Sequence, residues 1–488
     1  MSGVAPASGV AIATETAGLR RLLSNAGSLF GAYAGPRSLT FAAALLAARI
    51  LDPAAFGAYG AAAAIAMVLS ILCTLGMQPL LIRDIARNPQ RGALLVAAAV
   101  RIRVAAACLM FLVLALAATL LRFPADVSVA ALLLCAGHAC WAIAETYGAR
   151  VQAEERMQVW LRANLVFGVA AALFAGIAVI VMRSVPWFCA GLAAGQVLAM
   201  AYLIRREPVV LAAGERIGTE IGRLLRATAP FAVAFLLLTL FYKFDLPLLA
   251  RLRGAHEAGI YAAAYKLVDV VHALAVVAAA AVYPRLARAG SAGAARRTLE
   301  LLLLLAVPGA GLLWLLRAPV ITLLFGHAYD DAADALLLLA PATVLLTLNI
   351  AAGYVLAVAH HVPALAIAYA AALLAKIALC VLWIPAYGPT GAAGAMLGAE
   401  LLATALLAVA MWGARVPLPR WATVRLAGAA AACILLCALV AQVAPPAAAA
   451  ALMCMALAAL YRLGDALTSA ERATLLDALH GGRRVEAA

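Results

Sequence analysis

Nine charged side chains stand inside stretches of sequence that are otherwise apolar enough to lie in a membrane. The cations are Arg37, Lys243, Lys266, Arg317 and Lys376, and the acids are Glu145, Asp245, Asp269 and Glu400. A charge at the bilayer centre costs ~2.5–3.5 kcal/mol even on a lenient insertion scale, so such groups usually face a cavity and mark function. Fixed cations at that depth can hold an anionic group, because direct ion pairing offsets its lost hydration. The pattern therefore predicts an anion site within the membrane.

The lysines form a distinct group among these cations. All three Lys of the chain lie inside apolar stretches, whereas every cation in the basic loops is Arg. Lys266 and Asp269 are three residues apart, hence on one helical face, so they can pair. A self-neutralising structural pair is the alternative to a binding role. Lys243 and Asp245 are two apart and do not face each other, so each is expected to find partners elsewhere.

Backbone breaks accompany two of the cations. Arg37 follows Pro36 in the middle of the first stretch, and irregular backbone at membrane depth is tolerated only beside a cavity or other protein. This favours a binding role for Arg37, and Lys376 lies similarly deep in the eleventh stretch. Arg317 follows Pro308 and Gly311 and can instead reach outward.

The acids are candidates for coupling or gating. His138 and Glu145 are seven residues apart, near one helical face. A proton relay would use such residues, because His titrates near neutral pH and burial raises an acid toward it. A polar pair satisfied within the packing is the alternative. Asp245, Asp269 and Glu400 are assigned the same coupling or gating role, although Asp245, near the membrane surface, can also simply reach water.

The elements that position these residues are membrane spans. A hydrocarbon core of ~30 Å needs about 20 mostly apolar helical residues. Fourteen stretches qualify: 26–48, 57–82, 99–121, 127–148, 161–182, 185–204, 227–250, 258–284, 298–325, 335–359, 362–384, 390–413, 421–443 and 446–463. The sequence therefore predicts an all-α polytopic membrane protein with about 14 transmembrane helices.

Arginines in the intervening gaps predict the orientation. Of 36 Lys and Arg, 26 fall in alternate gaps on one side, among them Arg101 and Arg103, assigned to the gap before the third span. The opposite gaps hold Arg49, Arg122, Arg183, Arg251 and Arg253. By the positive-inside rule both termini are cytoplasmic.

Composition excludes several other classes of protein. The chain is 67% hydrophobic and 12% charged, with a mean hydropathy of +1.05, unlike a soluble domain. Its net charge of +14 would suggest nucleic acid in a soluble chain, but cations spread over cytoplasmic turns favour anionic lipid headgroups. All nine Cys lie inside spans without a CxxC pair, so we expect packing roles and no metal or other cofactor.

An internal repeat divides the chain. Arg49, Gly57 and Tyr59 match Arg251, Gly259 and Tyr261 at a constant offset of 202 residues. Six spans separate the copies, and an even number preserves direction. We therefore expect two parallel six-helix bundles about a pseudo-two-fold axis along the membrane normal, with a substrate cavity between them. The predicted parts are a cytoplasmic tail (1–25), the N-terminal bundle (26–206), a cytoplasmic linker (207–226), the C-terminal bundle (227–414), an appended helix pair (415–463) and a second tail (464–488).

Several segments resemble a known family. LLAARILDPAAFGAYG followed by TLGMQPLLIRDIAR is similar to the opening of Wzx-type oligosaccharide flippases of the multidrug/oligosaccharidyl-lipid/polysaccharide exporter superfamily. Asp52 stands where their turn commonly has Gly. In the second half, FDLPLLARLRGAHEAGIYAAAYKL, VYPRLA, ITLLFGHAYDDAADALLLLAP and WIPAYGPTGAAGAMLGAE continue the resemblance to about residue 413. Asp245 matches a position where the family often has an acid.

The resemblance implies a carrier and no enzyme. It implies alternating-access transfer of polyprenyl-diphosphate-linked oligosaccharide to the outer leaflet of the bacterial inner membrane, alongside the polymerase and glycosyltransferases of a surface-polysaccharide pathway. The alternatives are a lipid II flippase, which the fourteen spans permit, and an exporter of organic cations from the same superfamily. Five intramembrane cations against four acids favour an anionic substrate. A multispan enzyme would need a large outer loop, which the span pattern does not provide, and a structural scaffold remains a further alternative.

Overall fold

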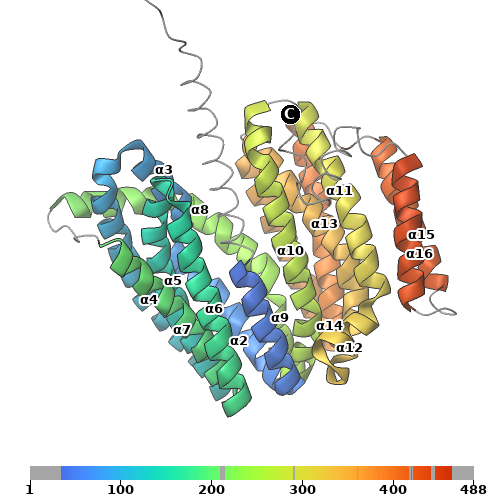
Figure 1. The fold of residues 1–488 in the computed structure, drawn as a ribbon, viewed down its shortest axis with the longest axis horizontal. Coiled ribbons are helices and arrows are strands. Elements are labelled where there is room, and N and C mark those ends of the chain that lie inside the picture. Colours follow the sequence, from blue (N-terminus) through green and yellow to red (C-terminus); the bar gives the residue numbers. More distant parts are fainter. Residues whose placement is uncertain are drawn as a thin grey trace, which may run out of the picture. The chain divides into compact units, whose positions relative to one another are not determined.

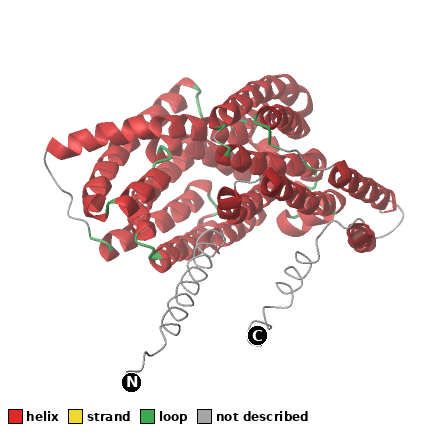
Figure 2. Ribbon diagram, turned by 90° about the horizontal axis from the view of Figure 1, so that it is seen from above, coloured by secondary structure: helices red, strands yellow, loops and turns green. Residues whose placement is uncertain are grey.

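The computed structural model describes residues 35–208, 215–289, 292–359, 361–416, 419, 421–440 and 446–463. Within these residues all regular secondary structure is helical (Figure 2). The tails predicted at 1–25 and 464–488, the start of the first span and the middle of the predicted linker lie outside them. The chain folds as two compact units, residues 1–262 and 263–488, and each is described by itself.

The first unit opens with a helix over residues 35–50 and ends within α10 (Figure 1). Its further elements are α2 (Pro53–Thr74), α3 (Gln78–Arg87), η1 (Pro89–Arg91), α4 (Gly92–Leu120), α5 (Ala125–Ala153), α6 (Met157–Met182), α7 (Val185–Arg206), α8 (Glu215–Lys243), α9 (Asp245–Arg253) and the start of α10 (Ala255–Ala289). The second unit continues through α11 (Ala292–Leu315), α12 (Arg317–Phe325), η2 (His327–Tyr329), α13 (Ala332–Val358), α14 (Val362–Gly413), α15 (Trp421–Val440) and α16 (Pro446–Leu463).

Each predicted span overlaps one of these helices, and the prediction of an all-α polytopic membrane protein is confirmed. Ten segments of the described chain are long and apolar enough to cross a membrane. The number fourteen stays a prediction. One segment, α14, contains two of the predicted spans. It consists of two helices, because the backbone at Gly388, between Pro385 and Pro389, is non-helical (φ 55°, ψ −127°).

Helix breaks divide three other predicted spans. Leu75 and Gly76 adopt left-handed φ values of 48° and 60° between α2 and α3. A single residue, Phe244, separates α8 from α9, and Leu316 separates α11 from α12. Backbone amides and carbonyls released at such breaks need partners inside the protein, so breaks mark places where a membrane helix is supported by its neighbours.

The two repeat copies meet at their matched glycines. A methyl group built on Gly57 would clash with the carbonyl oxygen of Ala255 and the backbone nitrogen of Gly259. One built on Gly259 would clash with the carbonyl oxygen of Pro53. Pro53 and Ala255 are themselves 202 residues apart, so each copy makes the same contact with the other. Such reciprocity is the signature of a local two-fold axis between α2 and α10.

The start of α8 lies within the predicted linker and is bound to the first unit. Ile217 and Leu224 are buried in an apolar cluster with Leu81 and Ile85 of α3. Arg223 of α8 pairs with Asp84 of α3 at 2.8 Å, and Glu220 pairs with Arg91 of η1. In Figure 1 this part of α8 crosses the bundle helices rather than running alongside them.

The appended pair α15 and α16 packs on one helix of the second unit. Leu303, Val307 and Leu315 of α11 share an apolar cluster with buried residues of both helices, among them Ala430 and Met453. Gly311 lets α15 approach closely, because an added methyl group would clash with the Ile434 side chain. Small residues at a crossing permit the close backbone approach that drives association in lipid.

Candidate functional site

A polar stripe runs along α5 through the interior of the first unit. His138, Trp141 and Glu145 lie on one helical face, with spacings of three, four and seven residues. The structure does not bring His138 and Glu145 together as a pair. The Nδ1 atom of His138 lies 3.1 Å from Nε2 of Gln196 on α7, while Glu145 has partners on α4 and α5. A direct relay between the two is therefore not built into this arrangement.

Glu145 forms an ion pair that sequence reasoning missed. Arg103 of α4 donates from Nη1 to Glu145 Oε2 at 3.4 Å, and the Trp141 indole nitrogen donates to Oε1 at 3.1 Å. The Arg103 side chain is 0% exposed and that of Glu145 is 18% exposed. A charge so deeply buried is retained only with a partner, because desolvation alone strongly disfavours it.

Arg103, assigned to the gap before the third span, lies within helix α4 and not in a loop. Helix α4 begins at Gly92, well before the expected start of the span at 99, so Arg103 already lies three turns inside the helix. Arg101 is exposed and Arg103 is 1% exposed, since residues two apart point to different sides of a helix. The available signal was the run Ala97 to Ala99, small residues that let other helices close over this face.

A second buried acid lies where α8 ends and α9 begins. Asp245, 1% exposed, accepts a hydrogen bond from the Tyr261 hydroxyl at 2.6 Å and one from the Leu246 backbone amide at 3.1 Å. The first copy of the repeat differs here: Ala43 occupies the position equivalent to Asp245, and Tyr59, equivalent to Tyr261, packs edge-on against Phe188 at 5.0 Å. The second copy of the repeat thus carries an acid, Asp245, at a position where the first copy has alanine.

The second unit buries a cation and an acid of its own. Lys376 and Glu400, on the two halves of α14, are both 0% exposed. Asn349 of α13 donates from Nδ2 to Glu400 Oε2 at 2.6 Å and to the Glu400 carbonyl oxygen at 3.2 Å. Two predicted site residues thus lie in the interior of this unit, and their roles in binding and coupling stay predictions.

The other predicted residues occupy more open positions. Arg37 is exposed, and Lys243, Lys266, Asp269 and Arg317 are half-buried. Arg317 donates to the Trp314 carbonyl oxygen at 2.9 Å, with its guanidinium 5.4 Å from that ring's centroid, so its charge is held beside the break before α12. Arg37 belongs to the first unit, and Lys266 and Lys376 belong to the second. That these three residues line one cavity stays a prediction.

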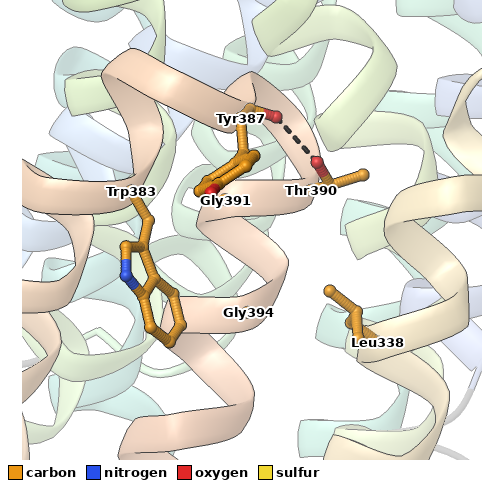
Figure 3. Close-up of a pocket in the computed structure, with 6 residues that line it drawn as sticks. All are labelled: Leu338, Trp383, Tyr387, Thr390, Gly391 and Gly394. Atoms are coloured by element: carbon orange, nitrogen blue, oxygen red, sulfur yellow. Dashed lines mark hydrogen bonds between the residues drawn. The ribbon is translucent and has the colours of Figure 1, made fainter.

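An aromatic pocket opens beside the bend of α14 (Figure 3). It encloses about 380 Å³ and is lined by Leu338, Trp383, Tyr387, Thr390, Gly391 and Gly394. Thr390 donates to the Tyr387 carbonyl oxygen at 2.7 Å, and Tyr387 is 65% exposed. Trp and Tyr are typical of membrane interfaces, where one end of the ring is apolar and the other wet.

The fold is shared with solved transporters. The lipid II flippase MurJ, in an inward closed conformation, matches with a TM-score of 0.73 at 12% identity, over 90% of this chain and 99% of that one. An inward-facing multidrug transporter of the MATE family matches with a TM-score of 0.61 at 13% identity, over 78% and 94%. A transporter of the same MOP superfamily from Pyrococcus furiosus, described as having a binding pocket of reversed polarity, matches with a TM-score of 0.58 at 14% identity, over 81% and 94%. These likenesses show that the chain has the fold of these solved transporters.

The family follows from the sequence itself. The model of the polysaccharide biosynthesis protein family matches residues 22–289, more than half of the 488. The chain belongs to that family, and the predicted resemblance to oligosaccharide flippases is confirmed. A comparison with curated protein sequences gives no match. The protein is therefore a multi-pass membrane protein of the polysaccharide biosynthesis family, with the fold of solved membrane transporters.

Proposed function

We propose that this protein moves a polyprenyl-diphosphate-linked oligosaccharide from the inner to the outer leaflet of the bacterial cytoplasmic membrane for surface-polysaccharide assembly. The observation that carries the proposal is a polysaccharide biosynthesis family sequence on the fold of a lipid flippase. Buried cations add the chemistry. Lys376 is buried inside a helix apolar enough to cross a membrane, and a carrier of a diphosphate needs fixed positive charge where that group crosses.

The matched glycines support alternating access. In the orientation predicted from the arginines, with both termini cytoplasmic, Gly57 and Gly259 follow the outer turns of the two repeat copies. Their contact would then close the outer ends of α2 and α10, and release of substrate to the outer leaflet would require that contact to open. A close glycine contact can open and close readily, because the two helices pack through complementary shape. At such a contact, no hydrogen bond between the helices has to break when they separate.

The acids have the role of setting the return of the empty carrier. Transfer of a dianion outward is helped by an inside-negative potential, at ~2.3 kcal/mol per charge per 100 mV, so ion coupling is not needed for the loaded step. Asp245, Asp269, Glu145 and Glu400 could instead exchange between a basic partner and a proton as the empty carrier resets. The Arg103–Glu145 pair at 3.4 Å is one such place in the first unit.

Two other substrates belong to the test. A lipid II flippase is favoured by the match to MurJ over 99% of that chain, and an organic-cation exporter by the match to a MATE transporter. Vesicles containing the purified protein would be loaded in turn with a fluorescent polyprenyl-diphosphate oligosaccharide, with lipid II, and with a quaternary ammonium dye. We expect the first substrate to cross faster than in protein-free vesicles. Transport of the dye alone would overturn the proposal, and transport of lipid II alone would reassign the substrate.

A further inference from the structure

The ion pair inside the first unit leaves hydrogen-bond donors over. Arg103 uses Nη1 for Glu145, but its Nε and Nη2 atoms are buried without a hydrogen-bond partner among the described residues. The indole nitrogen of Trp160 on α6 is also buried without a hydrogen-bond partner among the described residues. Trp160 is 3% exposed and Arg103 is 1% exposed. A buried donor without a hydrogen-bond acceptor lowers the stability of the folded protein by about 1–3 kcal/mol, and by more when the donor is charged.

Arg103 and Trp160 are linked through Glu145 and Trp141 by a chain of contacts across α4, α5 and α6. Trp141 donates to Glu145 at 3.1 Å, and its ring centroid lies 5.8 Å from that of Trp160. Gly148, one turn beyond Glu145, allows Trp160 to press against α5, because an added methyl group would clash with the Trp160 ring. The cluster therefore places the buried Arg103 guanidinium and the buried Trp160 ring beside the partly buried Trp141 ring.

The geometry of the guanidinium group identifies what the cluster lacks. Nε–H and Nη2–H point from the same edge of the plane, and this edge is the fork that receives an anion through two parallel hydrogen bonds. Glu145 is engaged from Nη1, away from that fork. Arg103 thus uses one edge of its guanidinium for Glu145, while its forked edge has no hydrogen-bond acceptor in the part of the chain that the structure describes. Buried polar groups in proteins normally have such a partner, so an acceptor is missing here.

We propose that Arg103, through its Nε and Nη2 edge, binds a small monovalent anion of the halide class, with the Trp160 indole as a further donor. A halide accepts several N–H donors at once. It also leaves the Arg103–Glu145 pair intact. The site does not depend on which substrate the protein carries.

The test uses the purified full-length protein in detergent, with sodium chloride or bromide replacing sodium gluconate at constant ionic strength. Halide binding to the folded state predicts a saturating rise in the unfolding midpoint, of roughly 2–4 °C for a bundle of this size. Bromide should also quench tryptophan fluorescence in a saturable phase that chloride reverses, since Trp160 and Trp141 border the site.

Matched variants separate this site from general salt effects. Arg103→Lys keeps the charge and removes the fork, so we expect it to lose both the saturable midpoint shift and the saturable quenching. Arg156→Lys alters another ion-paired arginine, whose partners are Glu207 and Glu154, and should keep both responses. A wild-type midpoint and fluorescence that respond identically to halide and gluconate would overturn the proposal and leave ordered water as the occupant. Equal halide responses in wild type and Arg103→Lys would also overturn it.

Discussion

Gly57 and Gly259, 202 residues apart in the chain, pack so closely that neither position has room for a methyl group. Each faces the backbone of the other's helix at the equivalent place, so one contact is made twice. This ties the internal repeat to a physical crossing of α2 and α10, and it restricts both positions to glycine for reasons of space rather than of backbone angle.

Alanine at either glycine should therefore force α2 and α10 apart. We expect Gly57→Ala and Gly259→Ala each to destabilise the protein by about 1–3 kcal/mol, the usual range for overpacking, and to reduce transport strongly. Thermal unfolding in detergent and transport by the same preparations measure the two effects. Gly309→Ala is the matched control, because nothing lies within 4 Å of a methyl group there. An equal loss in all three variants would show that the crossing is not special.

Breaking the pair of Arg103 and Glu145 should cost more than removing it whole. Arg103→Met or Glu145→Met alone leaves one buried group without its partner, a change worth roughly 3–5 kcal/mol in buried pairs. The double variant Arg103→Met with Glu145→Met should recover part of that loss. Unfolding midpoints of the four proteins form a double-mutant cycle. Strictly additive losses would mean that the 3.4 Å contact contributes nothing.

The hydrogen bond of Tyr261 to Asp245 is expected to control turnover. Tyr261→Phe removes the 2.6 Å donor, and Asp245→Asn removes the charge, so both should slow turnover more than they weaken substrate binding. Collapsing the proton gradient at constant voltage should slow wild type and affect Asp245→Asn less. Tyr387→Phe, at a tyrosine that is 65% exposed, is the control. Wild-type rates in Asp245→Asn would remove this acid from the mechanism.

The orientation can be measured directly by labelling. In a background without the nine native cysteines, single cysteines at Asp330 and Arg183 should react with an impermeant thiol reagent in intact cells. Cysteines at Arg216 and Arg472 should react only after the membrane is opened. The reason is the excess of Arg in alternate gaps. Strong external labelling at position 216 would invert the topology.

The helices were predictable because the bilayer fixes their length, and the repeat was predictable because Gly57 and Gly259 keep a constant offset. Breaks within spans were harder to foresee. Leu75 and Phe244 are ordinary apolar residues, and only tertiary packing selects them as the places where the helix stops. The first turns of α8 looked like linker because Glu220 and Arg223 are charged, although those charges pair with α3 and η1.

The burial of some charged side chains could be predicted from the sequence. Lys376, Glu400 and Asp245 are buried, as expected for charges placed well inside apolar stretches. Arg103 was not predicted to be buried, because the rule that sorts cations by gap treats any arginine near the end of a span as a loop residue. Trp160 escaped because a tryptophan in an apolar stretch gives no sign of whether its indole nitrogen will find an acceptor.

Translocation by the purified protein in vesicles tests the central claim most directly. A fluorescent polyprenyl-diphosphate oligosaccharide would be placed in both leaflets, and its exposure to an impermeant quencher followed over time, for wild type, Lys376→Met and the surface control Arg87→Gln. The account predicts rapid exposure of the inner-leaflet pool with wild type and Arg87→Gln, and loss of that phase with Lys376→Met at equal incorporation. Exposure no faster than in protein-free vesicles, or unchanged exposure with Lys376→Met, would contradict it.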